Sequence, residues 1–287
     1  MEIAFLSGKG GTGKSSICSA FISLANNVVA VDSDVDAANL YLIFSANNIT
    51  QTNYISGKNA IINTDKCIKC GLCKTLCQFD AINIIEGDYQ IDPISCDGCA
   101  ICYRKCPREA IDMVHSDESK LYVGDFKYGL LIYGRLAPGE ENSGKFISVI
   151  RDLAHKKAKE KSIDKIIIDG PPGIGCPFMS TITGVDKVVI VTEASKSAFL
   201  DLKRALEVAR EYLKQIYVIL NKYDLNNEVS NEIQLYCDKL NIPIVAKIPF
   251  DKEIVYAMVN KQTIIEYNKD SIIVGILKEA YEYIINK

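Results

Sequence analysis

The sequence predicts an α/β fold in which helices cover both faces of a mainly parallel sheet, with a smaller α+β module inserted into it. Two observations lead to this prediction. Short apolar strands alternate with amphipathic helices in the first and last parts of the chain, as in parallel sheets. Between these parts the composition changes to dense cysteine and turn residues. We therefore expect one domain formed by residues 1–58 and 119–287, interrupted by an insert over residues 59–118.

The expected elements follow from apolar patterning along the chain. Short apolar runs predict strands, and apolar residues at helical spacing predict amphipathic helices. The expected strands are Glu2–Leu6, Val28–Val31, Lys165–Ile168, Lys187–Thr192, Ile216–Leu220 and Pro243–Lys247. The expected helices are Ser15–Ala25, Ser197–Leu213 and Asp270–Ile285. The Lys-rich run His155–Lys161 is predicted to be a solvated helix end; a patch for a binding partner is the alternative.

Composition limits the classes of protein that fit. The chain of 287 residues carries a formal charge of −3, so no surface for nucleic acid is indicated over the whole molecule. No apolar run approaches the roughly 18 residues of a membrane helix, and the first residues lack the pattern of a secretory signal. Eleven cysteines indicate metal or redox chemistry in a reducing compartment. We expect a cytoplasmic protein without a membrane segment or a nucleic-acid partner.

A phosphate-binding loop is predicted between the first strand and the first helix. The segment GKGGTGKS from Gly8 to Ser15 fits the pattern G-x-x-x-x-G-K-[ST] of P-loop NTPases. Glycines let backbone N–H groups point at phosphate oxygens, and the helix N-terminus adds a positive field. Lys14 is expected to bridge the β- and γ-phosphates, and Ser15 to bind Mg²⁺. The predicted nucleotide-binding residues of the loop are Gly8, Gly10, Gly11, Thr12, Gly13, Lys14, Ser15 and Ser16.

Lys9 gives this loop a second lysine. The resulting K-G-G-T-G-K-S resembles the deviant Walker A motif of the MinD/ParA/Mrp and nitrogenase iron protein superfamily. In that superfamily this lysine reaches across a dimer to the partner's nucleotide. The resemblance implies a homodimer with ATP sandwiched at the interface, in which Lys9 stabilises charge that develops during phosphoryl transfer. A Lys9 that is only exposed to solvent is the alternative.

Two further motifs follow predicted strands. Residues 31–40, V-D-S-D-V-D-A-A-N-L, resemble switch I of the superfamily, in which Asp34 would orient the attacking water and Asp32 would serve the metal through water. The later segment I-I-I-D-G-P-P-G resembles a Walker B strand and an Mrp-like switch II. There, Asp169 would hold the water shell of Mg²⁺ and Gly173 would sense the γ-phosphate. The resemblance implies an ATPase, slow and stimulated by a partner, with catalytic residues Lys9, Lys14, Asp34 and Asp169.

A later segment bears on which base is bound. Residues 221–224, N-K-Y-D, match the N-K-x-D pattern by which GTPases read guanine. In MinD-like proteins an Asn at this place contacts adenine, and a later segment helps to wall the base. The resemblance favours ATP, with GTP as the alternative. It adds Asn221, Lys222, Pro249 and Phe250 to the nucleotide site.

Eight cysteines form two runs with the same spacing, C-x₂-C-x₂-C-x₃-C, so that a constant offset relates each cysteine of the first run to its counterpart in the second. The duplication resembles the bacterial dicluster ferredoxin, in which the last cysteine of each run ligates the other cluster. The resemblance implies two [4Fe–4S] clusters. The ligands would be Cys67, Cys70, Cys73 and Cys106 for the first, and Cys96, Cys99, Cys102 and Cys77 for the second. Zinc, the main alternative, favours paired C-x₂-C units.

One departure from this pattern and three other cysteines remain. Gln78 stands where the second run has Pro107, so the surroundings of the first run's last cysteine are expected to be more polar or more mobile. Cys18 and Cys237 are predicted to be buried in helices. Cys176, just after switch II, is either a small residue in a tight loop or a thiol that meets a partner's cluster or metal.

Together the motifs resemble MinD-superfamily ATPases that carry an inserted ferredoxin. The expected cofactors are ATP or ADP, Mg²⁺ and the two clusters. The function that the resemblance implies is ATP-driven assembly of iron–sulfur or other metallocofactors, with a redox or metallocofactor-related protein as partner. One alternative is ATP-gated electron donation to an acceptor protein, as by the nitrogenase iron protein. Another is a MinD-like positioning or scaffold protein.

Overall fold

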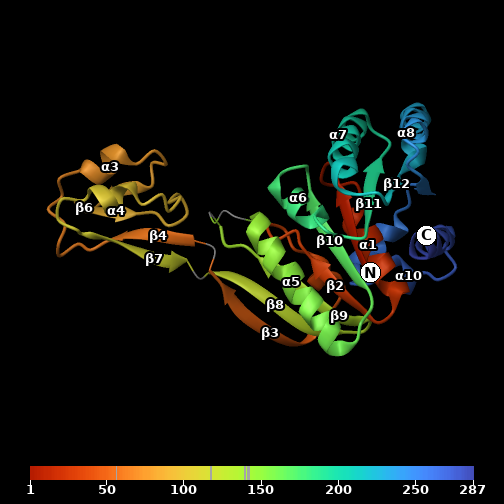
Figure 1. The fold of residues 1–287 in the computed structure, drawn as a ribbon, viewed down its shortest axis with the longest axis horizontal. Helices are drawn as coiled ribbons and strands as arrows, with labels where there is room; N and C mark the ends of the chain where they lie inside the picture. The colour runs from red at the N-terminus through yellow and green to blue at the C-terminus, as the bar shows by residue number, and fades with distance from the viewer. Residues whose placement is uncertain (56, 117, 139, 141–142) are drawn as a thin grey trace. The chain divides into compact units, whose positions relative to one another are not determined.

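A computed structural model describes the chain apart from residues 56, 117, 139 and 141–142 (Figure 1). The chain divides into two compact units. The large unit comprises Met1–Gln51, Tyr122–Gly134 and Ser143–Lys287, and the cysteine unit comprises Thr52–Leu121 and Arg135–Asn142. In chain order the cysteine unit therefore interrupts the large one.

A nine-stranded sheet with the order β13-β12-β11-β1-β10-β2-β9-β8-β3 forms the centre of the large unit. Its strands are β1 (Glu2–Ser7), β2 (Val28–Asp32), β3 (Asn47–Tyr54), β8 (Ser119–Phe126), β9 (Gly129–Arg135), β10 (Ile166–Pro172), β11 (Lys187–Glu193), β12 (Ile216–Asn221) and β13 (Ile244–Ile248). All neighbours from β13 to β9 pair in parallel. Because β1 lies between β10 and β11, segments from both sides of the cysteine unit complete one sheet.

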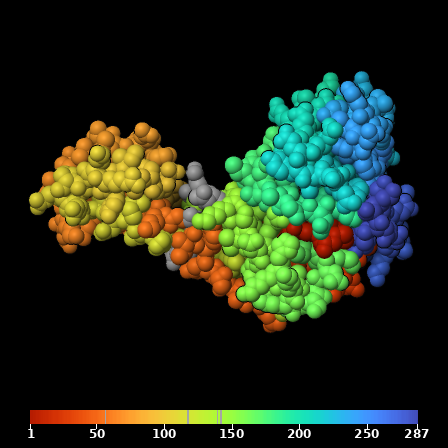
Figure 2. All heavy atoms as spheres, viewed as in Figure 1, coloured from red at the N-terminus to blue at the C-terminus, as the bar shows by residue number. Residues whose placement is uncertain are grey.

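Helices cover both faces of this sheet. They are α1 (Lys14–Ala25), α2 (Leu40–Ile43), α5 (Ser143–Lys161), α6 (Cys176–Ile182), α7 (Lys196–Tyr212), η1 (Tyr223–Leu225), α8 (Asn227–Lys239), α9 (Glu253–Val259), α10 (Ile264–Tyr267) and α11 (Ile272–Asn286). Strand β9 illustrates the two faces: Tyr133 packs in the core with α1 and α11, whereas a side chain at Gly134 would meet Phe146 and Ile150 of α5. Atoms of α5, α6 and α7, green to cyan, cover much of the latter face (Figure 2).

The predicted α/β fold with a mostly parallel sheet and flanking helices is confirmed. Each of the nine strands and helices predicted by range begins within two residues of its predicted start. His155–Lys161 forms the C-terminal end of α5, as predicted. The sequence analysis did not predict β3, β8 and β9. In β3 and β8 the apolar residues are interspersed with polar ones, whereas β9 contains a short, buried apolar run that was a usable signal. Among the described residues, no helix is both long and apolar enough to span a bilayer.

The cysteine unit repeats one backbone pattern twice. It contains α3 (Leu72–Leu76), α4 (Ile101–Lys105) and the antiparallel pairs β4 (Gly57–Ile62) with β7 (Ile111–Ser116), and β5 (Ile82–Ile85) with β6 (Asp88–Ile91). The N–H of Asn63 donates to Ala110 O at 2.7 Å, and the N–H of Asp92 donates to Ala81 O at 2.8 Å. The two donors occupy equivalent positions of the repeat, as do the two acceptors, so the two halves exchange equivalent bonds. The duplication seen in the sequence is therefore also a structural repeat.

Candidate functional site

The three nucleotide-binding motifs meet at one edge of the large unit's sheet. β1, β10 and β2 are parallel neighbours, and α/β folds bind ligands beyond the carboxyl ends of such strands. The phosphate loop follows β1, while Asp169 of β10 and Asp32 of β2 are direct partners in the strand ladder. The fold thus brings together motifs that are up to 155 residues apart in the chain.

Lys14 is held by a buried carboxylate. Its Nζ donates a hydrogen bond to Asp169 Oδ1 at 2.6 Å, and the two side chains are only 7% and 0% exposed. Burial acts to lower the pKa of Lys14, but the charge and hydrogen bond of Asp169 outweigh it and raise that pKa. Because both partners are desolvated, neither can lose the other without leaving an uncompensated charge.

A second buried carboxylate organises the turn after β2. Asp32 accepts hydrogen bonds from the N–H groups of Asp34, Asn39 and Leu40 at 3.1, 2.7 and 2.9 Å. Burial and the nearby charge of Asp169 nevertheless raise the pKa of Asp32 to about 7. Burial also raises the pKa of Asp34. The charge of Lys14 opposes both of these pKa rises, and Lys14 also pairs with Asp169. A bound Mg²⁺ would likewise stabilise the ionised forms of the three carboxylates.

Unpartnered buried atoms mark the same place. In the described part of the chain, Thr12 Oγ1, Asn39 Oδ1 and Asp169 Oδ2 are buried without a hydrogen-bond partner. Buried polar atoms are normally paired, so these three are hydrogen-bonding groups that a ligand could satisfy. Ser15 Oγ lies 3.4 Å from Asn39 Nδ2, beside them. Oxygens of this kind, together with water, are ligands that Mg²⁺ accepts, and the residues present therefore fit a Mg²⁺–nucleotide.

The loop backbone depends on glycine where it enters α1. Gly11 and Gly13 have φ angles of +83° and +89°, a region that residues with a Cβ rarely adopt. A Cβ on Gly13 would also collide with the side-chain nitrogen of Asn221. No side chain caps the start of α1, so its first N–H groups remain available to phosphate oxygens.

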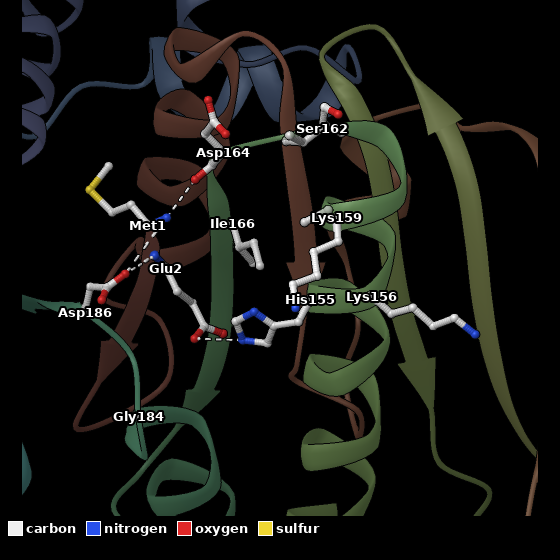
Figure 3. Close-up of a pocket in the computed structure, with 12 residues that line it drawn as sticks. Met1, Glu2, His155, Lys156, Lys159, Ser162, Asp164, Ile166, Gly184 and Asp186 are labelled. Carbon is white, nitrogen blue, oxygen red and sulfur yellow. Dashed lines mark hydrogen bonds and ion pairs between the residues drawn. The ribbon is translucent and has the colours of Figure 1, made fainter.

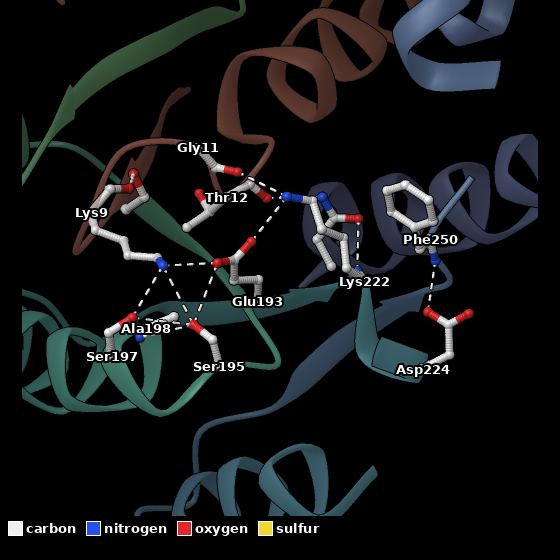
Figure 4. A network of polar contacts seen from close by, with 12 residues as sticks. Lys9, Gly11, Thr12, Glu193, Ser195, Ser197, Ala198, Lys222, Asp224 and Phe250 are labelled. Carbon is white, nitrogen blue, oxygen red and sulfur yellow. Dashed lines mark hydrogen bonds and ion pairs between the residues drawn. The ribbon is translucent and has the colours of Figure 1, made fainter. Parts of the chain in front are cut away.

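Asn221 and Lys222 hold this loop from β12. Asn221 Nδ2 donates to Thr12 O at 2.8 Å, and Lys222 Nζ donates to Gly11 O at 2.9 Å (Figure 4). Both residues were expected to line the nucleotide site, Asn221 by contacting the base. In this structure their side-chain donors bind loop carbonyls, so they shape the phosphate loop.

The segment expected to wall the base lies next to η1. Asp224 Oδ1 accepts the backbone N–H of Phe250 at 2.7 Å (Figure 4). Phe250 is 46% exposed, which leaves its ring free to stack on a base, and Pro249 beside it is half-buried. The carboxylate that a GTPase would use to read guanine thus has one oxygen engaged by this backbone.

Lys9 is engaged within its own chain. Its Nζ lies 2.8 Å from Glu193 Oε1 and donates to the hydroxyls of Ser195 and Ser197 at 3.4 and 3.2 Å (Figure 4). The side chain is 30% exposed. Lys9 therefore does more than face solvent, and in this structure it points to α7.

The other predicted residues lie around these. The N–H of Gly173, at φ +88°, donates to Ser7 O at 2.9 Å, which joins switch II to β1. Gly8 packs against α7, where a Cβ would lie 2.6 Å from Asp201, and Gly10 has open space around it. The hydroxyl of Ser16 donates to Met258 Sδ of α9 at 2.7 Å.

Sequence reasoning did not single out two residues of the site, Glu193 and Asn39. Glu193 ends the buried strand β11 and contacts two lysines, Lys9 and Lys222. An acidic residue at the end of an apolar strand was a usable signal. Asn39 lies in the switch I match, and its unpaired Oδ1 beside Ser15 became visible only in the structure.

In the cysteine unit, four cysteines line one cavity, with apolar neighbours that include Ile62, Leu72 and Ile111. The four are Cys67, Cys70, Cys73 and Cys106. They combine three thiols of the first run with the last of the second, the combination expected for one cluster. Burial, together with Cys67 and Cys70, raises the pKa of the Cys73 thiol. Burial likewise raises that of Cys102, with Cys96 and Cys99 adding to it.

Two further observations concern metal ligands and the remaining cysteines. Among the described residues, no group of three or more His, Cys, Asp or Glu side chains is arranged to hold a metal ion. A cubane differs from a single ion, because each of its cysteines binds a different iron. Cys18 and Cys237 are completely buried in α1 and α8, as predicted, and burial raises the pKa of Cys237 to about 12. Cys176 is exposed at the start of α6.

A pocket at the opposite, amino-terminal end of β1 contains none of the predicted site residues (Figure 3). Lys156 and Lys159 line it with His155, whose Nε2 lies 3.2 Å from Glu2 Oε2. The buried Glu2 carboxylate also accepts two hydrogen bonds from Arg151, at 3.0 and 2.8 Å. Its charge is therefore already compensated, and we assign this group a structural role.

Comparison with known proteins extends these observations. Residues 3–264 match the model of the CobQ/CobB/MinD/ParA nucleotide binding domain. An uncharacterized protein of Methanocaldococcus jannaschii is 40% identical over 98% of this chain and 95% of its own length. The chloroplastic homolog of the septum site-determining protein MinD from Arabidopsis thaliana is 25% identical over 96% of this chain and 72% of its own length.

Solved structures share the fold. The septum site-determining protein MinD of Pyrococcus horikoshii, complexed with Mg-ADP, matches with a TM-score of 0.58 and 19% identity. The match covers 99% of this chain and 95% of that one. At this identity the likeness concerns the fold alone.

Proposed function

Since the chain belongs to the CobQ/CobB/MinD/ParA nucleotide-binding family, we propose that it binds and hydrolyses Mg²⁺–ATP as a homodimer and couples this cycle to two [4Fe–4S] clusters in the cysteine unit. The observation that carries the ATPase part is the buried Lys14–Asp169 pair at the phosphate loop. It is surrounded by the unpartnered atoms Thr12 Oγ1 and Asp169 Oδ2. A lysine and a carboxylate prepared in this way can stabilise the phosphates and the metal-bound water.

ATP is the proposed nucleotide. Asp224, which would have to accept from guanine, already accepts from the N–H of Phe250. Competition between labelled ATP and unlabelled GTP for the protein tests this choice. Effective displacement by ATP is expected, and displacement by GTP at a tenfold lower concentration would overturn it.

The clusters are proposed from the cysteine spacing together with the cavity that Cys67, Cys70, Cys73 and Cys106 line. The second set would be Cys96, Cys99, Cys102 and Cys77. Such clusters supply one-electron transfer when bound. After anaerobic purification we expect a brown protein with about eight irons per chain. Two irons, or a single zinc ion, would contradict the cluster assignment.

The process we propose for this coupling is the assembly of an iron–sulfur or other metallocofactor on a partner protein. Cys176 supports it, since this exposed thiol lies three residues after Gly173, where the nucleotide state would move the loop. A thiol in this place can meet a partner's metal when ATP closes the dimer. Transfer of radiolabelled iron to an apo-acceptor, with and without ATP, measures the activity.

ATP-gated electron donation is the second candidate. Four cysteines per proposed cluster leave no ligand position free for cargo, which favours a permanent redox role. Stopped-flow oxidation of the reduced protein, with and without ATP and acceptor, separates the candidates. A rate that depends on ATP indicates gated donation, and a rate independent of ATP favours assembly. If the cysteines can be replaced without changing the ATP-dependent location of the protein in the cell, a MinD-like positioning or scaffold role is favoured instead.

A further inference from the structure

The cysteine unit contains a hollow of about 740 Å³ to which no role has been assigned so far. It lies between α4 and the paired strands β4 and β7. Gly98 and Ala100, from the loop that carries the second cysteine run, form part of its wall. A Cβ on Gly98 would collide with Lys58 O of β4, so this loop packs directly on the strand. Anything bound in the hollow therefore lies against the loop that holds three proposed ligands of the second cluster.

Three basic side chains line this hollow. Lys58 and His115 are direct partners in the β4–β7 ladder, so their side chains lie on the same face, and Arg104 comes from α4. All three are exposed, and no hydrogen bond or ion pair joins their side chains to another described residue. Lys58 and Arg104 are cations at neutral pH, and Asp112 is the one acidic residue in the described lining. The hollow therefore presents a net positive charge to solvent.

The internal duplication indicates that cluster binding alone does not require these cations. The constant offset between the two cysteine runs relates each basic residue to a position in the first half. For Lys58, Arg104 and His115, in that order, the equivalent residues are Gly87, Thr75 and Glu86. None of these is basic, and one is acidic. Because both halves repeat the same cysteine spacing, the basic hollow of the second half needs another explanation.

The form of the hollow favours a protein surface over a small molecule. Small-molecule pockets usually enclose most of their ligand, whereas Tyr103 and Ile55 in this lining are 48% and 53% exposed. These two side chains offer apolar contact area beside the cations, as interfaces between proteins do. Weak redox complexes have small interfaces, and opposite charges steer and orient such encounters. A hollow of this kind fits carboxylates that a partner protein presents.

We propose that this hollow is the docking site of the partner protein, and that the partner inserts an acidic segment with several adjacent Asp or Glu side chains. Carboxylates of the segment pair with Lys58 and Arg104, while Tyr103 and Ile55 pack beside it. The docking site rests on the proposed function, which requires a partner protein. It places that partner next to the second cysteine run rather than the first.

A synthetic hexaglutamate peptide with a neutral fluorophore is the probe for this site. Fluorescence anisotropy with the full-length, anaerobically purified protein should show binding at low salt that weakens as salt is added. Mg²⁺–ADP is present throughout, so that the phosphate loop is filled. In the double variant Lys58→Gln and Arg104→Gln, affinity should fall about three- to tenfold, the effect of losing two exposed ion pairs.

The matched control removes two other cations of the same unit. Lys66→Gln with Lys105→Gln changes two exposed lysines that do not line the hollow, and should leave the affinity for the peptide nearly unchanged. Equal losses in the two double variants would overturn the site, because net charge alone would then explain binding. Tighter binding of pyrophosphate than of hexaglutamate would also overturn it, in favour of a site for small anions.

Photo-crosslinking locates the peptide even if the variants fold poorly. Hexaglutamate that carries benzoylphenylalanine at one end should label Tyr103 or Met113, which line the hollow, as mapped by mass spectrometry. Labelling confined to the large unit or to the first cysteine run would overturn the docking site. Loss of peptide binding in a protein with about eight irons refutes this site alone. Peptide binding at the hollow in a purified protein that holds no iron would instead refute the proposed function.

Discussion

The phosphate site and the cysteine cavity are prepared for their ligands in opposite ways. The phosphate site is charged and already paired: Lys14 binds Asp169, and Asp32 accepts three backbone N–H groups. The cysteine cavity has apolar walls, and its lining includes thiols such as Cys73 whose pKa burial raises. The first site holds its shape through bonds within the protein. The second offers ligands whose thiolates need a metal to be stable.

This difference indicates where each unit obtains its stability. The large unit has an extensive core between sheet and helices, including the Phe5–Phe21 contact at 4.8 Å between ring centroids. The cysteine unit is small and exposes large apolar side chains such as Ile68, Ile84 and Ile94. Small domains commonly need metals to complete their stability. We therefore expect the cysteine unit to depend on its clusters, whereas the large unit folds without nucleotide.

The largest effect is expected from Cys73→Ala, which removes a thiol from the cavity. The protein should lose about four of its eight irons, and the cysteine unit should become sensitive to protease while the large unit stays intact. Iron analysis and limited proteolysis measure the two outcomes. Cys176→Ala, which removes an exposed thiol outside the cavity, is the control and should retain all iron. Full iron content in Cys73→Ala would contradict the proposed ligand set.

The next effect concerns Lys14 and Lys9, which lie in the same loop but have different partners. Lys14→Ala should abolish nucleotide binding and also lower the free energy of unfolding by about 3–5 kcal/mol, because Asp169 is left buried and unpaired. Lys9→Ala should leave nucleotide binding intact and reduce hydrolysis. Calorimetric titration with ADP, thermal melts and phosphate release measure these outcomes. Equal loss of nucleotide binding in both variants would contradict a role of Lys9 in trans.

A smaller effect is expected from pH. Burial raises the pKa of Asp32 to about 7 in the folded protein, above the roughly 3.9 of an unfolded chain. Between these values the folded protein keeps a proton that the unfolded chain has lost, so stability falls as the pH rises towards 7. Without Mg²⁺, the melting temperature of wild type should fall between pH 5 and pH 8, and that of Asp32→Asn, which has no carboxyl group to ionise, should fall less over the same range. Asp36→Asn, at an exposed neighbour, keeps Asp32 and should follow the wild-type change with pH. The same difference between wild type and Asp32→Asn at both pH values would contradict the shift.

The local parts of the phosphate site could be predicted from the sequence because the residues that form them are contiguous. Gly13, Lys14 and Ser15 are consecutive, and the apolar strand before the loop and the amphipathic helix after it indicate where the loop lies. The partners of the outer lysines could not be predicted. Lys9 binds Glu193, which lies in a distant part of the chain, because β11 is the neighbour of β1 in the sheet. The order of strands in a sheet cannot be predicted from local sequence patterns.

In the cysteine unit, by contrast, contacts between distant segments could be predicted from the sequence, because the unit is a repeat. Its repeat could be predicted from spacing alone, and the exchanged backbone bonds of Asn63 and Asp92 follow the same offset as the two cysteine runs. Edge strands were harder to predict, since β3 is almost entirely exposed and its sequence has no apolar stripe. The contact between Asp224 and Phe250, in the segment expected to wall the base, could not be predicted either, because it joins two loops 26 residues apart.

The smallest effect is expected from Asp224→Ala, which removes that bond. In the proposed site the phosphates contact the loop and Lys14, so loss of the anchor should only loosen the segment expected to wall the base. One hydrogen bond of this kind contributes about 0.5–1.5 kcal/mol, so ATP affinity should fall about two- to tenfold, measured with a fluorescent analogue, while the affinity for tripolyphosphate stays unchanged. Asp251→Ala, at a neighbouring carboxylate that accepts the N–H of Glu253, is the matched control. If Asp224→Ala leaves ATP affinity unchanged but abolishes binding of GTP, Asp224 reads guanine and the phosphate site belongs to a GTPase.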